Sequence, residues 1–275
     1  MPDPLMILRA MAAAAIAAAA ILLCSTSRKR PGDGGRAPLG WPLAIGLGFL
    51  TGAVAMGQRP ASLPGTDKDR LLSLIVPLVM ITETVLAAAR PNFYWLWATR
   101  LAGAAALVPI LLHGTIYLAG AEFTSAATWT TRERVMILGG IAMTLVIQWL
   151  SMVTLQDRGH TRAVWWTLAI TSITAGVATM LTGYMSAGML GLPLAAVCGT
   201  AAVFGSAAQG RMAGGGLVVA LACLGSILVM GHFFGALSTP YTVLLAAAPL
   251  LCWITECRPV RAALSLRHGT KNECR

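Results

Sequence analysis

The sequence predicts an all-α protein, a polytopic bundle of about nine transmembrane helices (eight to ten). The 275 residues are 57% hydrophobic and only 11% charged, whereas about a quarter of the residues in a soluble domain are charged. The apolar residues fall in runs of about 20, the length that carries a helix across a bilayer. These runs are apolar on every face, which disfavours barrel strands, because those alternate polar and apolar positions. The chain length leaves no room for a separate soluble domain.

Charged or Gly- and Pro-rich stretches separate the spans. The first run, Leu5–Cys24, is followed by basic residues instead of being preceded by them, so we interpret it as an uncleaved span and not as a signal peptide. Two uncharged stretches, 163–209 and 212–255, are each too long for one crossing and divide near 183–188 and at Leu237–Pro240. The expected spans are 5–24, 40–57, 71–89, 101–119, 135–155, 163–182, 189–208, 216–236 and 240–256, within a single domain, 1–257.

The basic residues indicate an orientation. With nine spans, fourteen of the 20 Lys and Arg residues lie on one side and six on the other. The positive excess marks the cytoplasmic side, so the N-terminus is expected outside and the basic tail, 258–275, in the cytoplasm. The bias toward Ala, Gly and Arg is typical of a GC-rich genome, which indicates the cytoplasmic (inner) membrane of a bacterium.

Glu83 is the only acidic residue well inside an expected span. A buried charge there costs several kcal/mol and asks for a partner or a function. Arg90 lies seven residues further on the same helix face, and Arg100 stands at the start of the next expected span. Two interpretations stay open: a carboxylate that couples transport to a proton or cation, or a carboxylate paired with one of these arginines for structural reasons.

Three further polar residues fall near the outer ends of expected spans. His113 and Tyr117 share one helix face of the fourth span, and His232 lies in the eighth at a similar depth. They would form a polar pocket near the outer face, with Tyr184 and Tyr241 contributing, or would serve only in hydrogen bonds between helices. Two histidines at matched depth could also hold a haem, but such sites usually show more histidines, so we expect no cofactor.

Aromatic, proline and small residues complete the pattern. The aromatic residues of 90–100 are expected to lie in a loop at the headgroup level. Prolines inside spans kink helices and sometimes line transport sites; here they are Pro77, Pro109, Pro193 and Pro249. Small residues four apart predict close helix packing, as in Ala44, Gly48 and Gly52, and in Gly231 and Gly235.

The sequence leaves the function undetermined and favours a transporter or permease for a small solute or ion. The alternative is a non-catalytic scaffold or assembly protein that packs through glycine-rich helix faces. No HExxH, GxSxG or P-loop motif is present, so we do not expect an enzyme. The six cysteines show no metal-ligand spacing, which predicts no metal site. The net charge of +10 resides in short loops, so the expected partners are the lipid bilayer and other membrane proteins or a second copy, without nucleic acid.

Overall fold

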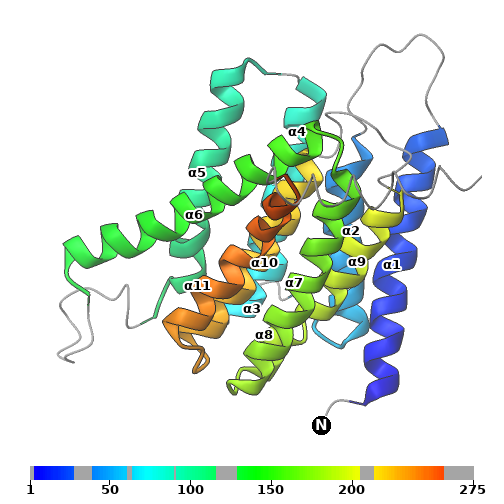
Figure 1. Ribbon diagram of the computed structural model, residues 1–275. Helices are drawn as coiled ribbons and strands as arrows, with labels where there is room; N and C mark the ends of the chain where they lie inside the picture. Colours follow the sequence, from blue (N-terminus) through cyan, green and yellow to red (C-terminus); the bar gives the residue numbers. More distant parts are fainter. Residues whose placement is uncertain are drawn as a thin grey trace, which may run out of the picture.

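The computed structural model describes residues 3–27, 39–60, 64–89, 91–115, 129–204 and 214–256, and helices make up 86% of them. No strand occurs in these segments, so the all-helical prediction is confirmed. In chain order the elements are α1 (Pro4–Ser27), α2 (Gly40–Ala55), α3 (Asp67–Arg70), the π-helix η1 (Leu71–Ile75), α4 (Val76–Ala89), α5 (Phe93–Leu112), α6 (Thr131–Asp157), α7 (Thr161–Leu181), α8 (Met185–Gly188), α9 (Gly191–Phe204), α10 (Gly214–Phe233), α11 (Thr239–Ala247) and the 3₁₀-helix η3 (Ala248–Glu256) (Figure 1).

Seven helical segments of the described chain are long and apolar enough to cross a membrane. They are Pro4–Ser25, Asp67–Ala89, Phe93–Leu112, Thr131–Asp157, Thr161–Leu181, Met185–Phe204 and Gly214–Phe233. Two shorter apolar helices, Gly40–Ala55 and Thr239–Trp253, pack in the same bundle. At about 1.5 Å per residue the first of these is about 24 Å long, which falls short of a hydrocarbon core of about 30 Å.

One end of the bundle is marked by the turn between α7 and α8. The Tyr184 hydroxyl donates to Asp67 at the start of α3 (2.6 Å to Oδ1), and Gln58, just beyond α2, donates to the Ser186 carbonyl (2.7 Å). We call this end the Tyr184 end; it lies at the bottom of Figure 1. It therefore gathers the end of α2, the start of α3 and the junction of α7 with α8.

The opposite end is marked by stacked tryptophans. The rings of Trp41 in α2 and Trp165 in α7 lie 5.8 Å apart, and the Arg158 guanidinium, just before α7, lies 4.9 Å from the centre of the Trp253 ring in η3. We call this end the Trp165 end. Helices that follow one another in the chain therefore run in opposite directions between the two ends.

Small residues let α1 and α2 pack backbone to backbone. Ala14 is fully buried, and a Cβ added at Gly48 would lie 3.0 Å from its carbonyl oxygen. A Cβ at Gly52 would come 2.8 Å from the Ala14 side chain and 2.6 Å from that of Pro193. The close packing expected at these glycines is present, and it joins α1, α2 and α9.

A second close approach joins α7 to the segment of α8 and α9. A Cβ added at Gly176 would lie 2.7 Å from the Gly188 carbonyl oxygen, and one at Gly191 would lie 2.5 Å from the Ser172 carbonyl oxygen. Neither position tolerates a side chain without movement of a backbone. The sequence analysis did not anticipate this contact.

The prolines have different local effects. Pro77 stands in the first turn of α4, directly after the π-helical turn η1, which widens the helix where the proline ring would meet the preceding turn. Pro109 lies inside α5, which ends three residues later. Pro193 lies in the first turn of α9, where the missing N–H has no partner to lose.

At Pro249 the last helix changes from α to 3₁₀ geometry. Pro249 has no N–H to donate to the preceding turn. The buried Gln148 side chain in α6 donates to the Ala246 carbonyl. A side chain of α6 thus bonds to the last turn of α11, next to this change of geometry.

Helix α5 differs most from the expected boundaries. The fourth span was expected over 101–119, whereas α5 begins at Phe93 and ends at Leu112. The aromatic segment is therefore the first two turns of a helix and not a loop, and Trp97 packs edge to face on Trp149 of α6 at 5.0 Å. Arg100 is consequently a mid-helix residue and not the first residue of a span.

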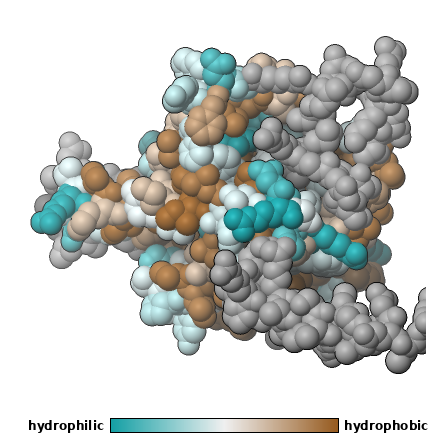
Figure 2. Space-filling view, turned by 45° about the horizontal axis from the view of Figure 1, so that its top comes forward, coloured by the Kyte–Doolittle hydropathy of each residue, from teal (hydrophilic) through white to brown (hydrophobic). Residues whose placement is uncertain are grey.

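The outside of the bundle is apolar. Large hydrophobic side chains are exposed along most of the helices, with Trp95 in α5 at 68% and Leu181 in α7 at 82%. Figure 2 shows hydrophobic surface over the flanks and a hydrophilic patch at the far left, over the start of α6, where Arg132, Glu133 and Arg134 lie. Monomeric soluble proteins rarely expose apolar patches of this extent, so the surface suits a membrane.

Candidate functional site

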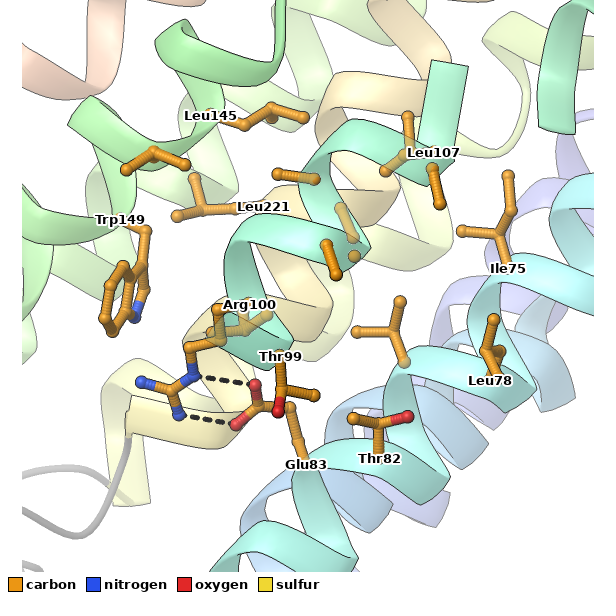
Figure 3. Close-up of a pocket in the computed structure, with 18 of the residues that line it drawn as sticks. Ile75, Leu78, Thr82, Glu83, Thr99, Arg100, Leu107, Leu145, Trp149 and Leu221 are labelled. Atoms are coloured by element: carbon orange, nitrogen blue, oxygen red, sulfur yellow. Dashed lines mark hydrogen bonds and ion pairs between the residues drawn. The ribbon is translucent and has the colours of Figure 1, made fainter. Parts of the chain in front are cut away.

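The buried carboxylate of Glu83 and the guanidinium of Arg100 form a two-point ion pair between α4 and α5. Arg100 Nε donates to Oε1 of Glu83 (2.8 Å) and Nη2 donates to Oε2 (2.5 Å) (Figure 3). Glu83 is only 2% exposed, and the Arg100 side chain is 12% exposed. This fork-to-fork geometry is the strongest form of a carboxylate–arginine pair, and it neutralises both charges locally.

Two further elements enclose the pair. The Arg100 guanidinium carbon lies 4.5 Å from the centre of the Trp149 ring in α6, a cation–π distance. On the other side, a Cβ added at Gly215, in the first turn of α10, would lie 3.1 Å from Glu83 Oε2. The first turn of a helix carries a partial positive charge, so α10 also stabilises the Glu83 carboxylate.

The ion pair closes one end of a cavity of about 320 Å³ bordered by α4, α5, α6 and α10. Its polar lining consists of Thr82 and Glu83 of α4, Thr99 and Arg100 of α5, and the indole N–H of Trp149 in α6. The remaining fourteen lining residues are apolar, among them Leu107, Leu145 and Leu221. As Figure 3 shows, the cavity has one polar end and a hydrocarbon-like interior.

The cavity opens sideways between α4 and α5. Leu78 of α4 and Ala106 of α5 line it and are exposed on the outside of the bundle. A Cβ added at Gly103, midway along this wall, would meet no atom within 4 Å. Helix α5 packs on α6 and α10 but scarcely on α4, which leaves the space between them.

Of the residues expected to form a site, the structure brings together Glu83 and Arg100. Arg90, the other candidate partner, and Tyr117 lie outside the described residues. His113 and His232 take no part in the cavity; they lie at the ends of α5 and α10 toward the Tyr184 end. Because residues 90–100 were expected to form a loop, the sequence analysis did not anticipate that Arg100 lies within a helix.

At the Tyr184 end His113 contributes its backbone, since its carbonyl and that of Leu111 accept from Nη1 of Arg70. This arginine caps the last turn of α5, where unpaired carbonyls favour a cation. The His232 ring is bound locally, with Nδ1 2.8 Å from the Leu237 carbonyl. Both histidines thus lie near polar groups that hold helix ends.

The contact between Tyr184 and Asp67 was not foreseen as a pair. The hydroxyl lies 2.6 and 2.7 Å from the two carboxylate oxygens, and Asp67 is buried. Burial, and then the hydrogen bond to Asp67, raise the pKa of the Tyr184 phenol, so the phenol stays protonated and acts as the donor. In sequence Asp67 is one of several charged residues in a short connection, and nothing there distinguishes it.

No group of three or more His, Cys, Asp or Glu side chains that could hold a metal ion occurs among the residues of the described segments. The cavity itself presents an ion pair beside an apolar space. Comparison with known protein families, with curated proteins and with solved structures finds no match to this chain.

Proposed function

We propose that this chain is a nine-span protein of a bacterial cytoplasmic membrane, with the N-terminus outside and the basic tail, 258–275, in the cytoplasm. The seven long apolar helices and the two shorter ones support the count, because all run between the same two ends of the bundle. The excess of Lys and Arg in the connections at the Trp165 end supports the orientation. The Trp165 end is then cytoplasmic and the Tyr184 end external.

Alkaline phosphatase, which is active only outside the cytoplasm, tests this topology. Fused after Asp69 it is expected to be active, and fused after Arg36 or Arg275 it is expected to be inactive. An active fusion after Arg275 would refute the nine-span arrangement, because an odd number of crossings places the two termini on opposite sides.

Within this bundle we propose that the cavity carries a small solute across the membrane. The observation that supports transport is the cavity of about 320 Å³ whose cytoplasmic end is closed by the Glu83–Arg100 pair. Pockets of about 300–1,000 Å³ with a few polar groups are typical of small-molecule sites. Intramembrane charged residues mark transport pathways in many membrane proteins.

The ion pair is suited to act as a cytoplasmic gate. In the closed state the pair gives each charge a partner in a low-dielectric region. Separation of Glu83 from Arg100 would open the polar end of the cavity toward the cytoplasm. A separated pair is costly in the membrane interior, so the open state needs a compensating group, which the solute supplies. The π-turn before Pro77 gives α4 a place at which to bend.

Purified protein in liposomes tests transport with three radiolabelled probes: leucine, choline and octanoate. The wild type should accelerate uptake of at least one probe over protein-free liposomes. Gly103→Leu, which fills the open wall of the cavity, should abolish that uptake. Gly139→Leu in α6 is the matched control, because a Cβ there also meets no atom within 4 Å but lies outside the cavity lining.

The second candidate is a scaffold that holds partners in the membrane. The local neutralisation of Glu83 by Arg100 and the glycine-mediated packing of α1, α2 and α9 favour it. It is the better account if wild-type protein carries none of the three probes faster than empty liposomes do.

A further inference from the structure

Three hydrogen-bond donors at the polar end of the cavity have no acceptor among the described residues. The indole Nε1 of Trp149 is buried without a partner, and Trp149 is 8% exposed. Arg100 uses Nε and Nη2 on Glu83, which leaves Nη1. The Thr82 hydroxyl also donates to no described atom, although that of Thr84 on the same helix bonds to the carbonyl four residues earlier.

Of the three donors only the Trp149 Nε1 is a buried atom, and a buried donor without an acceptor is costly and asks for an explanation such as a bound molecule. All three residues line the same cavity, and Figure 3 shows Arg100 beside Trp149 at one end of the space that also contains Thr82. A guest that satisfies them must present an acceptor atom. This requirement favours a carboxylate over an ammonium group, which has donors and no acceptor.

The charges at this end also favour an anion. Arg100 and Glu83 neutralise each other, and the first turn of α10 at Gly215 lies beside Glu83, so the potential that remains at this end is the partial positive charge of that helix start. The pocket lining contains no other charged or titratable side chain. An anionic group can therefore share the Arg100 guanidinium with Glu83.

The remainder of the cavity fits a hydrocarbon chain. At about 30 Å³ for a water-sized group, a volume of about 320 Å³ holds about ten non-hydrogen atoms. The walls around Leu107, Leu145 and Leu221 offer no polar group. The side opening at Leu78 and Ala106 faces the apolar outside of the bundle, so a chain can enter from the bilayer.

We propose that the cavity binds a monoanionic carboxylate with a single hydrocarbon chain, its head on Arg100 and Trp149 and its chain between α4, α5 and α10. Movement of this anion across the membrane rests on the proposed transport function, whereas its binding in the cavity does not depend on transport. Octanoate, with ten non-hydrogen atoms, is the matching probe.

Binding of radiolabelled octanoate to the full-length protein in lipid nanodiscs tests the proposal. Unlabelled octanoate should compete, whereas octanol and octylamine should compete about tenfold less well or worse, the loss expected for one charge-assisted hydrogen bond. Equal competition by octylamine or octanol would overturn the assignment of an anionic head. If palmitate competes as well as octanoate, the natural ligand is a fatty acid from the bilayer; if palmitate does not compete, the ligand is a water-soluble acid. Both outcomes support the carboxylate site.

Variants separate the site from general folding. Trp149→Phe keeps the ring and removes the Nε1 donor, so octanoate affinity should fall several-fold. Trp165→Phe is the matched control, because its Nε1 is also buried without a partner among the described residues but lies outside the cavity lining. An unchanged affinity of Trp149→Phe would overturn the proposed position of the head. Octanoate that binds but is not taken up into liposomes would leave this inference standing and refute the transport function.

Discussion

A double-mutant cycle at Glu83 and Arg100 measures how strongly the buried ion pair couples α4 to α5. Arg100→Met leaves the Glu83 carboxylate, 2% exposed, without its two charged hydrogen bonds. Removal of one partner from a buried pair typically costs about 3–5 kcal/mol. Glu83→Met leaves the guanidinium unpaired, at a somewhat smaller cost, because the Arg100 side chain keeps 12% exposure and the Trp149 ring.

The double variant, with methionine at both positions, should be far more stable than the sum of the two losses predicts. It buries no charge, and replacement of a buried pair by apolar residues is often neutral, so we expect its free energy of unfolding to return to within about 1 kcal/mol of the wild type. The surface variant Arg132→Met, at an exposed position in the first turn of α6, is the control and should not change stability.

Reversible unfolding in mixed micelles with increasing SDS, followed by tryptophan fluorescence, gives the four free energies. Additive losses in the double variant would refute the reasoning, because they would mean that the two side chains act independently. So would an Arg100→Met variant as stable as the wild type, since a carboxylate without its partner would then have to reach water or a second cation.

Three other contacts give single-site predictions in the same unfolding assay. Gly176→Leu should lower stability by at least about 1–3 kcal/mol, the cost of overpacking, because its Cβ would lie 2.7 Å from the Gly188 carbonyl oxygen; an unchanged midpoint would contradict the close approach. Tyr184→Phe removes the hydrogen bonds to Asp67 and should cost about 1.5–3 kcal/mol, a value near zero arguing against a buried contact. Gln148→Leu removes the side-chain bond to the Ala246 carbonyl of α11 and should cost about 0.5–1.5 kcal/mol; an unchanged stability would argue against this bond.

The sequence predicts the helices well where an apolar run ends at charges or at glycine and proline. The run of Leu71–Ala89 and the break at 183–188 are visible because they change composition locally. The start of α5 is not visible in this way. Residues 93–100 contain four aromatic residues and an arginine, a composition shared by interfacial loops and by helices whose polar group is neutralised within the bundle.

The cavity itself could not be predicted, because it depends on a partner that is distant in the sequence. Sequence alone offered Arg90 and Arg100 equally as partners for Glu83, and the pairing with Arg100 requires α5 to begin before it. The contact of Gly176 with Gly188 likewise depends on the shape of the turn between α7 and α8, which the spacing of small residues in the sequence does not predict. Moving Arg100 from a connection into a helix leaves thirteen basic residues against six, so the expected orientation does not depend on it.

The size of the cavity argues against a purely structural ion pair. Neutralising Glu83 requires Arg100 but no space beside it, and an empty cavity costs about 24 cal/mol per Å³. An enclosed empty space of about 320 Å³ would cost about 8 kcal/mol on this scale, whereas this cavity opens between α4 and α5 and can be filled from the outside. A lipid chain entering between α4 and α5 would remove that cost, but it would leave the Trp149 N–H and the remaining donors of Arg100 without acceptors. A guest with both a chain and an acceptor-bearing head meets both requirements, and for that reason the geometry favours binding of an amphiphilic anion over an empty cavity.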